Sequence, residues 1–122
     1  MKINLLSFTA LAKLMGMHRS APVATTQTYT GSVAGYPVSL TLTIFDNLAH
    51  GTLVYIRSGI PIRVEGTFDG TSLTIHEFDK KGRVTGIYSG KHSQTAYAGT
   101  WCSPSVQLKE MPFSFNAAGE AN

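Results

Sequence analysis

Three segments of this chain share a short pattern of a glycine, one further residue, and then an aromatic residue. They are Gly66-Thr67-Phe68, Gly86-Ile87-Tyr88 and Gly99-Thr100-Trp101. Successive side chains of a β-strand point to opposite faces, so the glycine and the ring of each segment lie on one face. A glycine on a crowded inner face leaves room for a large ring, and it lets the sheet bend sharply. The three segments therefore predict a small, strongly curved antiparallel sheet that closes into a barrel.

The rest of the chain beyond residue 24 also favours strands. Threonine, valine, glycine and aromatic residues dominate it, and turn signals recur at roughly the 8–12-residue spacing of an all-β domain. The pattern predicts eight strands, over residues 28–33, 38–45, 52–57, 60–68, 72–78, 83–89, 95–102 and 106–115. Short links between them favour antiparallel neighbours, and hence an eight-stranded up-and-down β-barrel. A two-sheet β-sandwich made of the same strands is the alternative.

The 122 residues have room for one folded domain. We divide the chain into a leader (1–24), a β-barrel domain (25–116) and a polar tail (117–122). The whole net charge of +3 arises from the leader, where Lys2, Lys13 and Arg19 meet no acidic residue. Because the domain itself is balanced and shows no basic stripe, we expect no nucleic acid as a partner.

The leader resembles a secretion signal, since Met1-Lys2 precede a short apolar run that extends to Ala12. This run is too short to span a bilayer, so we expect no membrane span. However, Lys13 interrupts the apolar pattern and no good cleavage site follows. A signal peptide predicts a secreted or periplasmic protein. The alternative, an amphipathic helix retained in the mature chain, predicts a cytoplasmic one.

No group of residues has the spacing of a catalytic or metal-binding motif. The four histidines are scattered at positions 18, 50, 76 and 92, without the convergent set that a metal needs. No Gly-x-Ser-x-Gly motif is present, and the single cysteine, Cys102, has no histidine nearby in sequence. We therefore predict no metal, no cofactor and no enzymatic activity.

One set of polar and aromatic residues is expected to share the inner face of the barrel. Tyr55 and Arg57 alternate with Leu53, and Glu77 alternates with Ile75. Arg57 and Glu77 then lie near strand ends, at a barrel mouth above an aromatic floor, as in a small-molecule site. The candidate ligand-binding residues are Tyr55, Arg57, Glu77, Tyr88, Tyr97 and Trp101. The alternative is that the tyrosines only fill the barrel and that the ion pair is solvated.

An eight-strand meander with glycine–aromatic pairs resembles the calycin-like barrels, which include the avidins and the lipocalins. It is also similar to small secreted bacterial proteins of unknown function with repeated Gly-x-aromatic strands. Gly99-Thr100-Trp101 is similar to the lipocalin Gly-x-Trp motif, which in that family lies in the first strand and here lies in the seventh. Avidins line their biotin pocket with several tryptophans, whereas this chain has one. The resemblance therefore implies the barrel fold and does not imply biotin.

These features predict a non-enzymatic, extracytoplasmic binding module for a small apolar ligand or a protein partner. The alternative is a structural or self-assembling surface protein that forms homo-oligomers through an open β edge or the N-terminal helix. The uncharged strand over residues 38–45 motivates this alternative, because an unpaired edge of that kind can add strands from a neighbouring chain.

Overall fold

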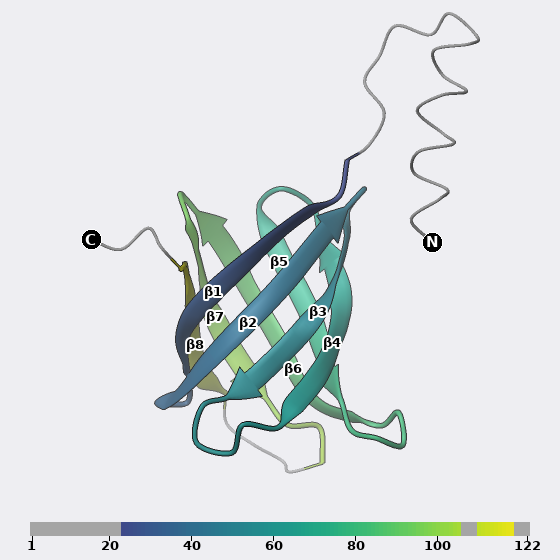
Figure 1. Cartoon of the computed structure of the whole chain (residues 1–122), viewed down its shortest axis with the longest axis vertical. Helices are drawn as coiled ribbons and strands as arrows, with labels where there is room; N and C mark the ends of the chain where they lie inside the picture. The colour runs from purple at the N-terminus through teal and green to yellow at the C-terminus, as the bar shows by residue number, and fades with distance from the viewer. Residues whose placement is uncertain (1–22, 106–109, 119–122) are drawn as a thin grey trace, which may run out of the picture.

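The computed structural model describes residues 23–105 and 110–118, which form eight β-strands and no helix. The strands are β1 (Thr25–Val33), β2 (Tyr36–Phe45), β3 (Leu48–Tyr55), β4 (Pro61–Phe68), β5 (Ser72–Phe78), β6 (Val84–Ser93), β7 (Ala96–Cys102) and β8 (Met111–Ala117). Each strand pairs antiparallel with the next, and β1 pairs with β8, so the sheet closes into a barrel (Figure 1). The predicted up-and-down barrel is confirmed, and the chain does not form the two-sheet sandwich.

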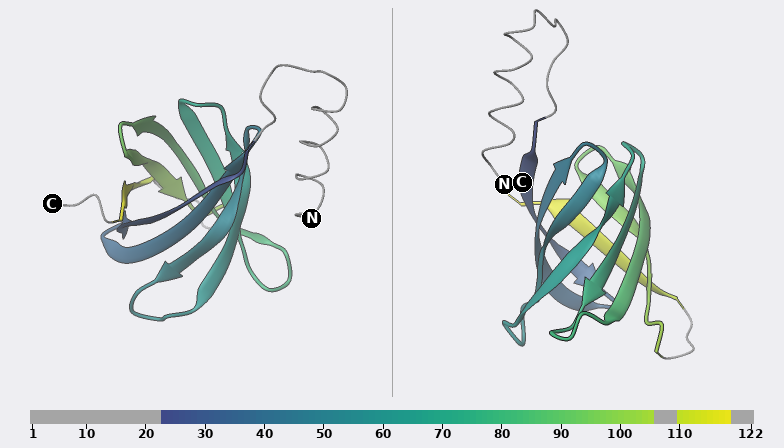
Figure 2. Two further views of the ribbon diagram at one scale, coloured as in Figure 1. Left: turned by 45° about the horizontal axis from the view of Figure 1, so that its top comes forward. Right: turned by 90° about the vertical axis from the view of Figure 1, so that its right-hand side faces the viewer.

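The two ends of the barrel differ in their connections. At the lower end in Figure 1, which we term the loop end, residues 56–60 join β3 to β4 and residues 79–83 join β5 to β6. At the opposite end, termed the turn end, Asp46 and Asn47 join β2 to β3. Both have positive φ angles, 49° and 71°, as in the tight turns that suit a hairpin. The oblique course of the strands around the barrel is clear in the further views (Figure 2).

Glycines on the inner face let neighbouring strands approach one another closely. A Cβ atom on Gly66 would overlap the carbonyl oxygen of Thr74 on β5, and one on Gly99 would overlap that of Ser89 on β6. The same overlap with the backbone of a neighbouring strand would occur at three further glycines. The whole group comprises Gly31, Gly51, Gly66, Gly90 and Gly99. At these positions glycine is therefore needed for the close approach of neighbouring strands.

Two strands, β3 and β6, extend through a glycine at which the sequence predicted them to stop. β3 begins at residue 48 rather than 52, and β6 continues to residue 93 rather than 89. Glycine is typical of turns, but Gly51 and Gly90 are paired within these strands. They are sites of close approach, so the chain passes through them without turning.

Other strand boundaries differ at the ends of the domain. β1 begins at Thr25, three residues before the predicted start. β8 begins at Met111, and the predicted start at Val106 falls in residues 106–109, outside the described residues. β8 ends at Ala117, one residue inside the expected tail. Almost all of the leader, residues 1–22, also lies outside the described residues.

Side chains from all eight strands fill the interior. The largest fully buried ones are Tyr88, Phe115, Leu40, Leu42, Leu53, Leu73, Ile75, Val33, Val38 and Val64. They occupy alternate positions along their strands, as predicted for the strand over residues 38–45. Burial of this apolar surface is the main force that stabilises the barrel.

We predict that Gly66→Ala destabilises the protein by about 1–3 kcal/mol, because the new Cβ would overlap the backbone of β5. Thr67→Ala, on the exposed face of the same strand, is the matched control and should cost less than about 1 kcal/mol. Urea unfolding of both variants measures the difference. Equal effects would mean that β4 and β5 do not approach each other as closely as described.

Candidate functional site

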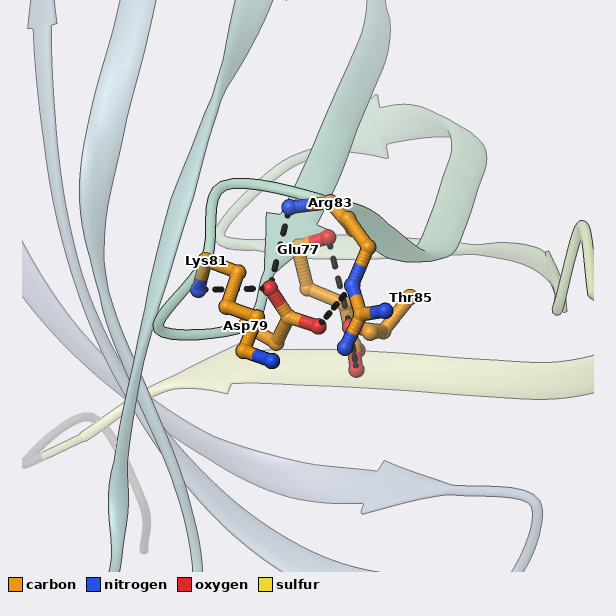
Figure 3. Close-up of polar contacts among 5 residues, drawn as sticks. All are labelled: Glu77, Asp79, Lys81, Arg83 and Thr85. Carbon is orange, nitrogen blue, oxygen red and sulfur yellow. Dashed lines mark hydrogen bonds and ion pairs between the residues drawn. The ribbon is translucent and has the colours of Figure 1, made fainter.

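Glu77 is the buried charged residue of the described chain, with 6% of its surface exposed. It lies near the loop end of β5, where the register with β6 shifts between Glu77 and Phe78 in a β-bulge. The bulge places the Thr85 hydroxyl 3.1 Å from Oε2 of Glu77 and 3.3 Å from its carbonyl oxygen (Figure 3). A bulge re-aims the side chains around it, and here it supplies the carboxylate with a hydroxyl donor.

Asp79 holds the loop between β5 and β6 (Figure 3). Its Oδ1 accepts the backbone N–H groups of Lys81 and Arg83 at 2.8 and 2.9 Å, and its Oδ2 accepts Nε of Arg83 at 2.9 Å. These hydrogen bonds, chiefly that from the Arg83 backbone, hold the pKa of Asp79 below its usual range. The closed loop fixes the ends of both strands, and it thereby fixes Glu77 and Thr85.

Tyr88 supplies the second hydroxyl to the carboxylate. Its hydroxyl donates to Oε1 of Glu77 at 2.7 Å, and the residue is fully buried. Burial raises the pKa of Tyr88 far above its usual value, and the negative charge of Glu77 raises it further. Burial also raises the pKa of the half-buried Tyr55, which lies beside Tyr88 at the end of β3. Both tyrosines are therefore neutral at physiological pH, and Tyr88 donates to the carboxylate.

Trp101 places an unpaired polar atom beside Glu77. Its indole Nε1 is buried and has no hydrogen-bond partner in the described structure. A Cβ atom on Gly86 would collide with this nitrogen and would lie 2.7 Å from Cδ of Glu77. Gly86 therefore makes room for the Trp101 ring, whereas the missing Cβ of Gly66 faces the backbone of β5.

We refer to these residues as the Glu77 cluster: Tyr55, Glu77, Thr85, Tyr88 and Trp101. The structure thus brings together four of the six candidate residues, from β3, β5, β6 and β7. Sequence reasoning missed Thr85. Strict alternation along β6 turns it away from Tyr88, and only the bulge brings its hydroxyl to the carboxylate.

Arg57 lies outside the cluster. β3 ends at Tyr55, whose carbonyl oxygen accepts the N–H groups of Ser58 and Gly59 at 3.1 and 2.9 Å. This turn places Arg57 in the exposed loop, with its guanidinium 5.9 Å from the centre of the Tyr36 ring. The predicted inner-face position of Arg57, and its pairing with Glu77 at a barrel mouth, are therefore wrong.

Tyr97 is on the inner face but at the turn end of the barrel. Its ring centre lies 4.7 Å from that of His92 and 5.4 Å from those of Tyr29 and Phe68. Burial raises the pKa of the Tyr97 hydroxyl. Tyr29 and Phe68 pack edge to face on Tyr97, and His92 packs on it at a tilt. Tyr97 and the Glu77 cluster therefore occupy opposite ends of the interior.

Two open hollows lie on the outer wall. The first, of about 430 Å³, lies between β3 and β4, and the second, of about 460 Å³, lies beside the loop over residues 79–83. Pro61 and Arg63 line both of them. The middle of the barrel is filled and aromatic rings occupy the turn end, and neither hollow is lined by a residue of the Glu77 cluster.

No family model, no curated protein and no solved structure matches this chain. The closed eight-stranded barrel is compatible with a calycin-like fold. Across residues 23–105 and 110–118, no three histidine, cysteine or acidic side chains are grouped to hold a metal ion. In the same residues, no helix has the length and apolar character needed to cross a membrane.

We predict that Tyr88→Phe lowers the free energy of unfolding by about 1–3 kcal/mol, because Oε1 of the buried Glu77 loses its donor. Tyr36→Phe removes the same hydroxyl from an exposed ring and should change stability by less than about 0.5 kcal/mol. Thermal and urea unfolding measure both effects. A Tyr88→Phe variant as stable as the wild type would contradict the hydrogen bond.

The lowered pKa of Asp79 predicts a pH effect on the loop. Since the folded-state pKa lies below the unfolded one, the stabilising contribution is present above the unfolded value and is lost as the pH falls through the folded value. We therefore expect the amide resonances of Lys81 and Arg83 to move together at acidic pH, and Asp79→Asn to abolish this titration. Titration of these amides near neutral pH would contradict the hydrogen-bonded loop.

Proposed function

We propose that this protein is a non-enzymatic binding module that receives a polar group of a small molecule at the Glu77 cluster. The observation that most supports this is the buried indole N–H of Trp101, which has no partner and lies at Gly86 beside the Glu77 carboxylate. Native proteins leave few buried donors unpaired, so an unpaired one indicates a specific structural or functional cause. An unpaired donor costs about 1–3 kcal/mol, which a hydrogen-bond acceptor on a ligand would recover.

The ligand enters from the loop end, where Tyr55 and Trp101 are only half-buried. Large apolar side chains at this end are exposed: Tyr36, the first residue of β2, by 53%, and Ile56 and Ile60, on the loop after β3, by 55% and 57%. They offer contact area to the apolar part of a ligand whose polar group reaches the cluster. The apolar ligand predicted from the sequence is thus, in this proposal, one that also carries a polar group.

The composition of the cluster favours binding over catalysis. General acid–base chemistry ordinarily needs two titratable groups with different pKa values near the working pH. The cluster holds one carboxylate, and burial raises the pKa values of Tyr55 and Tyr88 away from neutrality. The extracytoplasmic location remains part of the proposal and is supported by the signal-like sequence of the leader.

A protein partner is the second candidate, and the exposed apolar residues of the loop end favour it. Self-assembly through an open edge has less support, because all eight described strands are paired on both sides. The route through an N-terminal helix depends on residues 1–22, which lie outside the described residues.

The indole N–H resonance of Trp101 tests the proposed site directly, because the chain has one tryptophan. We expect small amines, alcohols and amides, added one at a time, to shift this resonance more than the amide resonances of the turn end. Trp101→Phe keeps a ring and removes the donor, so it should weaken binding about tenfold, as measured by calorimetry. If no compound of the set shifts the indole resonance, the proposed site is wrong, and a protein partner becomes the better candidate.

A further inference from the structure

The negative charge of Glu77 has no counter-charge in the part of the chain that the structure describes. Neither of the two ion pairs found there includes it. Its oxygens instead receive two neutral hydroxyl donors, from Tyr88 and Thr85. Buried charges in proteins are ordinarily paired with an opposite charge or a metal, because the desolvation of an unpaired ion is strongly unfavourable.

The groups around the carboxylate suit an organic cation better than a metal ion. Besides Thr85, the side chains that accompany it in the cluster are aromatic: Tyr55, Tyr88 and Trp101. The faces of such rings attract ammonium groups, and the attraction is stronger away from water. A metal would require further carboxylate, imidazole or thiolate ligands, and the described residues supply no such group of three.

We infer that the ligand of the Glu77 cluster is a small organic amine whose ammonium group pairs with the Glu77 carboxylate beside the aromatic rings. This inference rests on the proposed function and narrows the class of its ligand. An ionised carboxylate has about four acceptor positions, so the ammonium group can bind without displacing the hydroxyls of Tyr88 and Thr85. An ammonium group donates hydrogen bonds and accepts none, so in this inference the acceptor for the Trp101 indole N–H is a second group on the ligand.

Phenethylamine and 2-phenylethanol test the inference, because they match in size and differ in charge at neutral pH. The fluorescence of the single tryptophan follows binding of both compounds, and calorimetry confirms the affinities. We expect the amine to bind the wild type at least tenfold more tightly than the alcohol. Glu77→Gln should remove this preference. Glu65→Gln, which changes an exposed carboxylate on the outer wall, should retain it.

Equal affinities of the wild type for the amine and the alcohol would overturn the inference and leave the binding site intact. This comparison needs no variant, so it holds even if Glu77→Gln fails to fold. Lys109→Ala removes the one lysine of residues 106–109, which lie outside the described residues, and should leave amine binding unchanged. Tighter amine binding by Lys109→Ala would show that the chain supplies its own cation, and would overturn the inference. No response to either compound would overturn the inference together with the proposed site.

Discussion

Close approach between neighbouring strands is the constraint on which the rest of this structure depends. Glycines on the inner face remove the Cβ atoms that would overlap backbone, at Gly66 against Thr74 and at Gly99 against Ser89. The sheet can therefore curve tightly enough for eight strands to close. A barrel of this size has an interior that side chains fill, and Tyr88 and Phe115 are fully buried in it.

The alternation of residues along the strands could be predicted from the sequence, and it correctly placed Tyr55, Glu77 and Trp101 on the inner face. Strand ends could not be predicted as well, because glycine is common both in turns and in sharply curved strands. Gly51 and Gly90 lie within strands, whereas Gly59, with a φ angle of 69°, lies in a turn. Only pairing with the neighbouring strand distinguishes the two cases, and pairing is not a local property.

The errors at the candidate site have the same physical origin. The position of Arg57 depends on where β3 ends, and hydrogen bonds to the Tyr55 carbonyl end it two residues early. The role of Thr85 depends on a bulge, which inserts one residue and breaks the alternation on which the prediction relied. The bulge adjoins the loop that joins β5 to β6, and the hydrogen bonds of Asp79 fix the shape of that loop. The Glu77 carboxylate and its Thr85 donor thus lie where the regular alternation of the strands is interrupted.

The buried carboxylate is hard to explain as a device for stability. Replacing buried ionic groups by apolar residues of similar volume is often neutral or stabilising, so a barrel that only had to fold could hold a leucine in place of Glu77. The chain instead places two hydroxyl donors on this carboxylate and leaves the Trp101 indole N–H unpaired beside it. The opposite end of the same barrel shows the contrast, because there Tyr29, Phe68 and Tyr97 fill the interior by ring packing. A buried carboxylate at one end of the interior, with an unpaired N–H beside it, is the pattern expected of a site that meets a ligand.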